Sequence, residues 1–357
     1  MAVKEAGPFA QALDRRVTEG ALGTLYEKLP GNKVRCYACA HQCLILDGLR
    51  GICKVRYNQG GTLMVPHGYV GALQCDPTEK KPFFHVFPGS DALTMGMLGC
   101  DLHCSYCQNW VTSQALRDPG ALSEPMDVSP RQLVDIAQRY DAKLVATSYN
   151  EPLITSEWAV DVFKEAKRRG FTTAYISNGN ATRRVLEYIR PWTNCYKIDL
   201  KSMRDKNYRS LGGKLENILN GIRMVHEMGF WLEIVTLTIP GFNDSDEELG
   251  DIAAFLAGIS PAIPWHVTAF HKDYKMLDPD NTPAETLIRG AKIGEAAGLQ
   301  YIYAGNLPGR VGEYENTRCP RCQTTLIRRF GYRILEDRLS GTGRCFKCGN
   351  SIPGVWN

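Results

Sequence analysis

The 357-residue chain contains no run of about 18 apolar residues, and its first residues, MAVKEAGPFAQALDRR, lack the apolar core of a secretory signal. Its 42 Lys and Arg against 38 Asp and Glu leave a net charge of +4, too small to imply a membrane or nucleic-acid partner. With 44% hydrophobic and 22% charged residues, the composition excludes a disordered chain, a collagen and a coiled coil. We therefore expect a soluble, cytoplasmic protein with neither membrane nor nucleic acid as a partner.

Cysteine, by contrast, is abundant, with 13 residues. In a chain of this size that is not exported, such a number favours metal binding over disulfides. Two cysteines stand alone, Cys75 and Cys195, which we interpret as a loop thiol and a buried strand residue. The others form three groups: Cys36, Cys39, Cys43 and Cys53; Cys100, Cys104 and Cys107; and Cys319, Cys322, Cys345 and Cys348.

The middle of the chain alternates between strand-like and helix-like patterns. Strands are expected over 93–98, 143–149, 172–177, 194–200, 231–238, 265–270 and 299–303, and helices over 129–140, 156–170, 182–189, 215–229, 246–258 and 283–298. Ser129 suits the cap of the first helix and Pro130 its first position. Six or so such units predict an α/β fold, with a parallel sheet that is open or partly closed as a barrel.

Two different segments flank this repeat. We expect residues 1–90 to form a helical lead-in, over residues 1–30, followed by a Cys-rich metal module. Residues 91–312 should form the repeat, and residues 313–357 a second Cys-rich module.

The central cysteines have the spacing C-x3-C-x2-C and follow the first strand of the repeat. Three thiolates within eight residues can ligate three irons of a [4Fe–4S] cluster and leave the fourth iron open to a small molecule. The loop lies at the carboxyl end of a strand, where barrels keep their chemistry. The alternative is a zinc site that takes a fourth ligand such as His103.

This motif, with Tyr106 before the last cysteine, resembles the signature of the radical S-adenosylmethionine (radical SAM) enzymes. The resemblance implies an incomplete TIM-like (β/α)6 barrel and a [4Fe–4S] cluster whose open iron chelates S-adenosylmethionine. It also implies reductive cleavage to methionine and a 5′-deoxyadenosyl radical, which takes a hydrogen atom from an unidentified substrate. The resemblance assigns no further catalytic residue.

Contacts to S-adenosylmethionine follow from the same resemblance. Glu151 in SYNEP would hold the methionine amino group, although Tyr149 and Asn150 replace the glycines usual in the family. Ser177 and Asn178 end the next strand at the barrel mouth.

Further along the chain, Asp199 and Lys201 match an Asp-Leu-Lys of the pyruvate formate-lyase activase branch, which also has a later histidine. That histidine is His271 in TAFHKDY, with His266 as the weaker match. Taken singly, Lys201 could be a surface residue and His271 an ordinary loop histidine.

A narrower resemblance runs from about residue 25 to the end. The motifs CYACAHQC, DPTEKKPFFHVFPGS, GCDLHCSYCQNW, YNEP, WHVTAFHKDYKM, YAGN and the tail CPRC to IPGVW are similar, in order, to the AmmeMemoRadiSam-system radical SAM enzymes. This resemblance implies Memo- and AMMECR1-family proteins as candidate functional partners, and a reductant such as ferredoxin or flavodoxin. It leaves the substrate open, with a protein among the candidates.

The C-terminal cysteines form two C-x2-C pairs, the spacing of a zinc ribbon. Zinc is favoured over rubredoxin-like iron or a cluster. A substrate or nucleic-acid grip is the functional alternative to a purely structural ribbon, and its arginines would be Arg318, Arg321, Arg328 and Arg329.

The N-terminal cysteines have the irregular spacing C-x2-C-x3-C-x9-C, with His41 inside it. The irregularity and the histidine, which could replace one thiolate, slightly favour zinc. An auxiliary [4Fe–4S] cluster that relays electrons or binds substrate is the alternative.

The stretch EKKPFFH precedes the first strand and raises the possibility that His85 lines the mouth of the site, with Lys80 and Lys81 solvated and the phenylalanines in the core. Three alternatives to the main reading remain: a glycyl-radical-enzyme activase acting on a partner protein, a metal-binding or electron-transfer module without turnover, and an RNA modifier that grips through the ribbon.

Overall fold

The structure is a computed structural model that describes residues 7–339 and 341–356. Residues 1–6, the beginning of the expected helical lead-in, lie outside the described residues.

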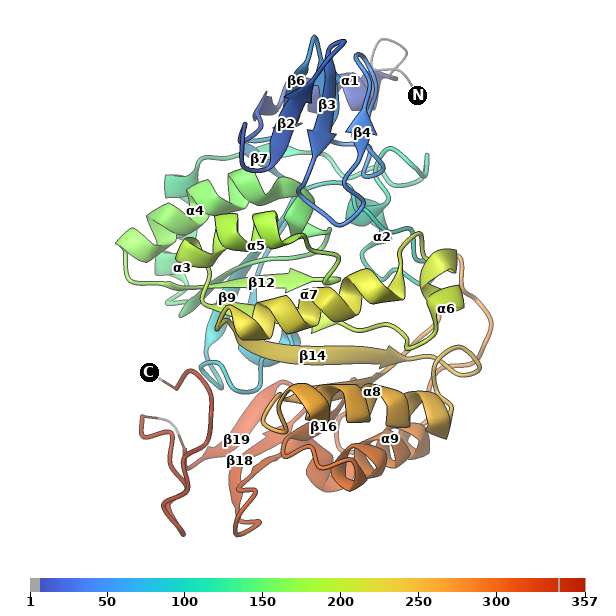
Figure 1. Ribbon diagram of the computed structural model, residues 1–357. Helices are drawn as coiled ribbons and strands as arrows, with labels where there is room; N and C mark the ends of the chain where they lie inside the picture. The colour runs from blue at the N-terminus through green and yellow to red at the C-terminus, as the bar shows by residue number, and fades with distance from the viewer. Residues whose placement is uncertain (1–6, 340, 357) are drawn as a thin grey trace.

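The centre of the molecule is an eight-stranded sheet (Figure 1). In sheet order its strands are β16 (Ile302–Gly305), β15 (Trp265–Ala269), β14 (Trp231–Thr238), β13 (Cys195–Asp199), β12 (Thr172–Ser177), β11 (Leu144–Thr147), β9 (Asp91–Gly96) and β8 (Ala72–Pro77). The seven strands from β9 to β16 are parallel, and β8 is antiparallel to β9. The sheet is bounded by β8 and β16 instead of closing on itself. The expected α/β incomplete barrel is confirmed.

Helices follow the strands and cover the sheet (Figure 1). They are α3 (Pro130–Arg139), α4 (Ser156–Arg168), α5 (Arg183–Ile189), α7 (Leu215–Glu227), α8 (Asp246–Ile259) and α9 (Ala284–Ala296), with the short α2 (Trp110–Ser113) and α6 (Asp205–Ser210) and the 3₁₀ turns η2 (Thr78–Lys80), η3 (Pro152–Thr155), η4 (Arg190–Trp192) and η5 (Gly312–Glu315). Ser129 caps α3 as predicted, because its hydroxyl accepts from Gln132 N while the Gln132 side chain accepts from Ser129 N. Parallel strands covered in this way are buried on both faces, which is why β9, β11 and β15 read as continuous buried runs.

The N-terminal module is mostly strand, so the expected helical lead-in over residues 1–30 is wrong beyond Asp14. Its elements are α1 (Pro8–Asp14), β1 (Val17–Glu19), β2 (Tyr26–Leu29), β3 (Lys33–Cys36), β4 (Leu44–Ile45), β5 (Tyr57–Gln59), β6 (Thr62–Pro66) and β7 (Tyr69–Val70), the last paired with β10 (Met126–Asp127). Val17–Glu19 pairs with β6, so ladder bonds to a distant strand outweigh local helix formation there. Strand β8 was not predicted; Cys75 lies in it instead of in a loop, and the expected boundary at residue 90 falls between two paired strands.

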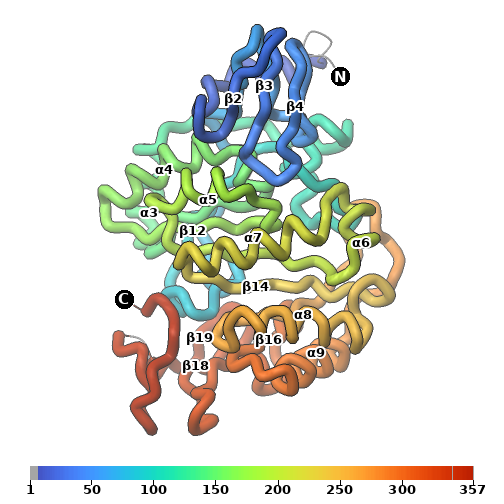
Figure 2. The backbone as a smooth tube through the Cα atoms, viewed as in Figure 1, coloured from blue at the N-terminus to red at the C-terminus, as the bar shows by residue number. Residues whose placement is uncertain are grey.

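The C-terminal module is a three-stranded antiparallel sheet of β17 (Thr317–Arg318), β18 (Thr325–Phe330) and β19 (Arg333–Asp337). Its last residues return to the barrel, where Val355 forms a β-bridge with Val86. The N-terminal and C-terminal modules lie at opposite ends of the molecule (Figure 2).

Each outer module places one buried arginine against the barrel. Arg56, 1% exposed, donates from Nη2 and Nη1 to the two carboxylate oxygens of Glu157 in α4, at 2.6 and 3.0 Å. Arg329, 4% exposed, donates to Phe84 O at 2.9 Å, and its Nε lies 3.5 Å from Glu79. Because Arg329 is buried, it is not available to the arginine grip considered above.

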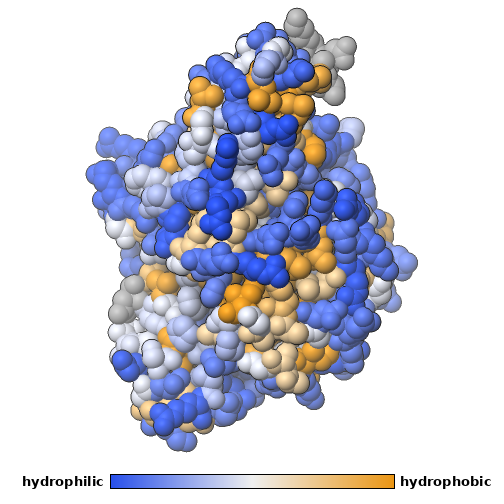
Figure 3. All heavy atoms as spheres, viewed as in Figure 1, coloured by the Kyte–Doolittle hydropathy of each residue, from blue (hydrophilic) through white to orange (hydrophobic). Residues whose placement is uncertain are grey.

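The face of the molecule shown in Figure 3 is mainly hydrophilic, with local apolar patches. One exposed set belongs to the segment between Cys43 and Cys53 and comprises Leu44, Leu46, Leu49 and Ile52. Within residues 7–339 and 341–356, no helix combines the length and the apolar character that a membrane crossing requires.

Candidate active site

A cavity of about 590 Å³ opens where the parallel strands end. Its lining comes from the segments that follow β9, β11, β12 and β13, together with side chains from β8 and from the turn between β18 and β19. The carboxyl ends of adjacent parallel strands meet at one edge, so residues distant in the sequence converge there. This edge contains the three central cysteines and six of the seven residues expected to contact S-adenosylmethionine.

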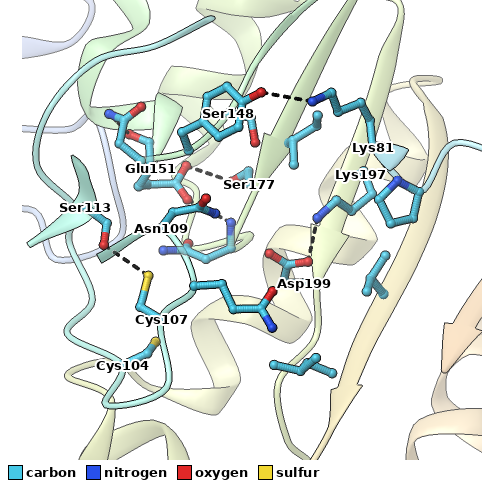
Figure 4. Close-up of a pocket in the computed structure, with 18 of the residues that line it drawn as sticks. Lys81, Cys104, Cys107, Asn109, Ser113, Ser148, Glu151, Ser177, Lys197 and Asp199 are labelled. Carbon is cyan, nitrogen blue, oxygen red and sulfur yellow. Dashed lines mark hydrogen bonds and ion pairs between the residues drawn. The ribbon is translucent and has the colours of Figure 1, made fainter. Parts of the chain in front are cut away.

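All three central cysteines line this cavity (Figure 4 labels Cys104 and Cys107). Cys107 Sγ lies 3.1 Å from Ser113 Oγ, and Leu102 N donates to Cys100 Sγ at 3.4 Å. Burial raises the pKa of Cys104 to about 11, so a cation is needed to hold this thiol as a thiolate. His103 is exposed and packs against Gly212, outside the cavity lining, which argues against the zinc alternative with that ligand.

Glu151 is 1% exposed and faces the same cavity. Its carboxylate accepts from Leu153 N at 3.0 Å, from Ser177 Oγ at 2.8 Å and from Asn178 N at 2.7 Å. Burial, and then the nearby Asp101 carboxylate, raise the pKa of Glu151 to about 8. A cation placed beside this carboxylate would therefore gain from the interaction. The structure brings Glu151, Ser177 and Asn178 together as the sequence predicts.

The turn before Glu151 keeps a glycine-like backbone without glycine. Tyr149 has φ +67°, in the left-handed region that glycine adopts freely. Its carbonyl accepts from Thr112 Oγ1 at 2.7 Å, its hydroxyl accepts from Lys81 Nζ at 2.9 Å, and Asn150 Oδ1 accepts from Met97 N at 3.1 Å. These contacts hold the turn in one conformation, which the sequence did not settle because Tyr149 and Asn150 replace the usual glycines.

Asp199 and Lys201 both line the cavity at the end of β13. Lys201 Nζ lies 3.8 Å from Asp199, and Lys197 Nζ donates to Asp199 at 2.5 Å (Figure 4). These two lysines lower the pKa of Asp199 against the opposing effect of burial, so the site holds a carboxylate flanked by two ammonium groups. Sequence reasoning missed Lys197, although its spacing of two from Asp199 in KIDLK places both on one face of the strand.

Tyr106 and the two candidate histidines differ in position. Tyr106 lines the cavity and is 4% exposed. His271 is exposed in the loop after β15 and does not line the cavity, and His266 is buried at 2.7 Å from Glu233. The structure therefore brings together the predicted contact residues except for His271.

The EKKPFFH segment contributes Lys80, Lys81 and Pro82 to the cavity lining. Lys80 and Lys81 line the cavity, and Lys81 is 6% exposed and donates to Asp76 at 3.0 Å, so it is not simply solvated. Phe83 lies in the core as expected. His85 lies 2.7 Å from Pro353 O and 2.7 Å from Tyr303 Oη, in the interior and outside the mouth.

Several cavity residues were not named as site residues from the sequence. They are Asn109, which lies in the quoted motif GCDLHCSYCQNW, Ser113, Asn306, which lies in the quoted motif YAGN, and Tyr332. Tyr332 lies in the turn between β18 and β19, so the C-terminal module contributes to the cavity wall. Only the assembled fold places these residues there.

The C-terminal cysteines form a closed group. Their four Sγ atoms all lie within 4.8 Å of one another, and the Cys319–Cys348 and Cys322–Cys345 sulfurs are 3.6 Å apart. A tetrahedral zinc with Zn–S bonds of about 2.3 Å requires sulfur separations of about 3.8 Å. The four thiols thus lie close enough together to hold one metal ion, and Cys195 is a buried strand residue as predicted.

The N-terminal cysteines lie together but less closely. Cys36, Cys39 and Cys53 are buried and Cys43 is half-buried. Burial, and then Asp101, raise the pKa of Cys39 well above its ordinary value, and the three other thiols of the group raise it further. Among the described residues, the C-terminal set is the one that meets the 4.8 Å separation, and the N-terminal set does not.

Comparison with known proteins places this geometry in context. The sequence profile of the Radical SAM superfamily matches residues 96–256, which include the central cysteines, Glu151 and Lys201. An uncharacterized protein of Methanocaldococcus jannaschii is 35% identical over 333 residues, covering 92% of this chain and 98% of that protein. The isethionate sulfite-lyase activating enzyme of Oleidesulfovibrio alaskensis is 26% identical over 56% of this chain and 66% of its own. The pyruvate formate-lyase-activating enzyme of Clostridium pasteurianum is 24% identical over 50% and 80% respectively.

Proposed function

The chain belongs to the radical SAM superfamily, and from that premise we propose that it cleaves S-adenosylmethionine reductively at the cavity lined by Cys100, Cys104 and Cys107. The observation that carries the proposal is that three thiols and the buried Glu151 face one cavity, with no fourth cysteine in its lining. Three thiol ligands fit a [4Fe–4S] cluster with one open iron. With S-adenosylmethionine bound and one electron supplied, such a cluster gives methionine and a 5′-deoxyadenosyl radical that abstracts hydrogen from a substrate.

The residues around the thiols hold the cosubstrate in this proposal. Glu151 accepts hydrogen bonds from the methionine ammonium, and Ser177 and Asn178 fix the orientation of its carboxylate. Asp199 and Lys201 offer one group of each charge to the rest of the cosubstrate, and Tyr106 closes the wall. His271 has no role in the proposal because it lies outside the lining.

The test is anaerobic. The protein is reconstituted with iron and sulfide, then mixed with S-adenosylmethionine and dithionite, and 5′-deoxyadenosine and methionine are quantified. We expect both products from the native chain and from Cys75→Ala, which removes a cysteine outside the three groups, and neither from the triple variant Cys100→Ala, Cys104→Ala, Cys107→Ala.

A second readout does not depend on turnover. S-adenosylmethionine should change the EPR signal of the reduced cluster in the native protein and in Cys75→Ala. A cubane signal that S-adenosylmethionine leaves unchanged, together with no deoxyadenosine, would overturn the proposal.

The substrate class has one specific pointer. Relatives named as activating enzymes for pyruvate formate-lyase and isethionate sulfite-lyase favour a partner protein as the substrate, as in a glycyl-radical-enzyme activase. Memo- and AMMECR1-family proteins are the candidates to test first, with ferredoxin or flavodoxin as reductant. Incubation with the right partner should give that partner a stable organic radical visible by EPR.

We also propose zinc at Cys319, Cys322, Cys345 and Cys348. Support comes from their sulfur separations of 3.6 Å, which suit one tetrahedral ion. Residues 313–357 would then form a zinc-ribbon-like module that is fixed by the metal.

A further inference from the structure

The N-terminal cysteines lie close together, three of them buried and Cys43 half-buried. Cys36 ends β3, and its backbone N–H donates to the carbonyl of Cys43 at 2.9 Å, which folds the intervening loop back on itself. Gly51 lies beside this loop, where a Cβ would be 3.6 Å from Cys43 Sγ. The side chains of Cys36, Cys39 and Cys53 are 6–7% exposed, so these thiols face the interior.

The separation of the four sulfurs distinguishes between metals. A single zinc ion draws four thiolates to about 3.8 Å from one another, and the C-terminal group shows such separations. A [4Fe–4S] cube carries its four thiolates on separate irons and holds them further apart. Among the described residues, neither the N-terminal group nor the central group meets the 4.8 Å separation of the C-terminal one. The N-terminal group therefore resembles the central group and not the zinc-like one.

His41 does not complete a zinc site. Its Nε2 lies 3.1 Å from the Asp101 carbonyl and 4.0 Å from the Asp101 carboxylate. Among the described residues, no three metal-ligating atoms that include the His41 ring lie within 4.8 Å of one another. The histidine thus contacts the barrel, which removes the main sequence argument for zinc.

A buried cation without a full set of partners lies beside the thiols. Arg56 is 1% exposed and binds Glu157 through its Nη atoms, but its Nε is buried without a hydrogen-bond partner among the described residues. The charges of Cys36 and Cys53 act on this guanidinium, so the arginine faces the cysteine group. An unpaired buried N–H is unfavourable, and a cluster sulfide or thiolate sulfur would supply the missing acceptor. A [4Fe–4S] cluster with four thiolates carries net negative charge, which Arg56 would offset.

We infer that Cys36, Cys39, Cys43 and Cys53 bind a second [4Fe–4S] cluster, with Arg56 as its buried counter-charge. These residues lie outside the range that matches the Radical SAM profile, residues 96–256.

The position of this site suggests its use. Asp101, 0% exposed, adjoins Cys100 in the sequence and acts electrostatically on Cys39 and Cys43. Gly99, the residue before Cys100, lies beside the N-terminal cysteine group, because a Cβ at Gly99 would be 3.1 Å from the carbonyl oxygen of Cys53. Arg117 ties the two loops by donating to Leu102 O at 2.9 Å and to Ile52 O at 2.6 Å. The two cysteine groups are thus neighbours across a single layer of backbone and one carboxylate.

The second cluster would pass electrons one at a time to the central cysteines, a role that rests on the proposed function. A carrier of the ferredoxin or flavodoxin class loses one electron and the N-terminal cluster gains it. The N-terminal cluster then returns to its oxidised state as the central one is reduced. The transfer makes and breaks no bond and moves no proton.

The experiment measures metal content in the full chain. Native protein, the central triple variant (Cys100→Ala, Cys104→Ala, Cys107→Ala), the N-terminal double variant Cys39→Ala, Cys43→Ala and the control Cys75→Ala are reconstituted with iron and sulfide in the presence of zinc. Iron and zinc are then counted, and the iron is typed by Mössbauer spectroscopy. We expect about eight cubane irons per chain in the native protein and the control, and about four in each of the other variants, with zinc unchanged throughout.

The central triple variant keeps the result separate from the proposed function. About four cubane irons in that variant support the second cluster even if S-adenosylmethionine is not cleaved by the native chain. Zinc in place of iron at the N-terminal group, or fewer than four irons in the triple variant, overturns the inference, whatever the native chain does with S-adenosylmethionine. The adjacency has its own readout: the EPR spectrum of fully reduced native protein should show spin coupling absent from both cluster variants, and a spectrum that is the sum of the two variants would contradict it.

Discussion

The N-terminal and C-terminal modules each set one buried arginine against the barrel, Arg56 and Arg329, yet they hold their four cysteines at different separations. The Sγ atoms of the C-terminal cysteines lie at separations that suit one tetrahedral ion. The N-terminal thiols are mostly buried as well, but their Sγ atoms lie further apart. The N-terminal group also lies against the central cysteine loop, while the C-terminal module contributes Tyr332 to the far rim of the cavity. On the two proposals above, the C-terminal cysteines would hold a structural ion and the N-terminal cysteines a redox cluster.

The largest effect is expected at the C-terminal group. Changing the buried Cys319 and Cys345 to serine should remove about one zinc per chain and unfold residues 313–357, because structural zinc contributes about 10–16 kcal/mol in small modules. Metal analysis and limited proteolysis measure both outcomes, with Cys75→Ser as the control. A protease-resistant module without metal would mean that the sheet of β17–β19 holds itself together.

Replacing either of the two buried arginines should lower stability by a smaller amount. Arg56→Met leaves Glu157 as an uncompensated buried charge and should lower the free energy of unfolding by about 3–5 kcal/mol. Arg329→Met should lower it less, because its ion pair with Glu79 is longer, at 3.5 Å. Urea denaturation of the metal-free proteins provides the comparison. The double variant Arg56→Met, Glu157→Leu should recover most of the loss, and no recovery would show that the arginine acts through another contact.

Asp101 should give an intermediate effect. Its carboxylate accepts from Asn178 Nδ2 and Asn180 Nδ2, both at 2.7 Å, so Asp101→Ala leaves two buried amides unpaired. We expect a loss of about 2–3 kcal/mol in the free energy of unfolding. Asp280→Ala, at a 97% exposed side chain paired with Lys272, is the matched control and should leave the free energy of unfolding unchanged. Equal losses of unfolding free energy in the two variants would show that the buried contacts of Asp101 do not stabilise the region between the two cysteine groups.

The smallest expected effect depends on pH. Because the pKa of Glu151 is raised to about 8 in the fold, the folded protein holds a proton that the unfolded chain releases near pH 4.3. Stability should therefore fall as pH rises from about 4.3 to about 8. Between pH 5 and pH 6, the metal-free native protein should lose roughly 1 kcal/mol relative to Glu151→Gln. Parallel pH profiles of the two proteins would show that Glu151 is ionised in the fold.

The sequence predicted the repeat and most of the cavity for a physical reason. Ser177 and Asp199 are the last residues of their strands and Glu151 follows another, and parallel strands bring their carboxyl ends to one edge. His271 was assigned from a motif match alone, and in the structure it lies in the loop after β15 and does not line the cavity.

Other features depend on contacts between distant residues. The pairing of β1 with β6 and of β8 with β9 overrides local patterns, so neither was predicted. Lys81 is held at the cavity by its hydrogen bond to the hydroxyl of Tyr149, which lies 68 positions further along the chain. The kind of metal that a cysteine group binds depends on the separation of its sulfur atoms, which the spacing C-x2-C-x3-C-x9-C does not determine. The sequence also contained no sign that Asp101 and Arg56 lie beside the N-terminal thiols, because only the fold brings them there.

The most direct test is anomalous diffraction from crystals of the anaerobically reconstituted protein, recorded at the iron and zinc edges. The account predicts iron at Cys100, Cys104 and Cys107, a second iron centre at Cys36, Cys39, Cys43 and Cys53, and zinc at Cys319, Cys322, Cys345 and Cys348. Zinc at both outer groups, or no iron beside the central cysteines, would contradict it.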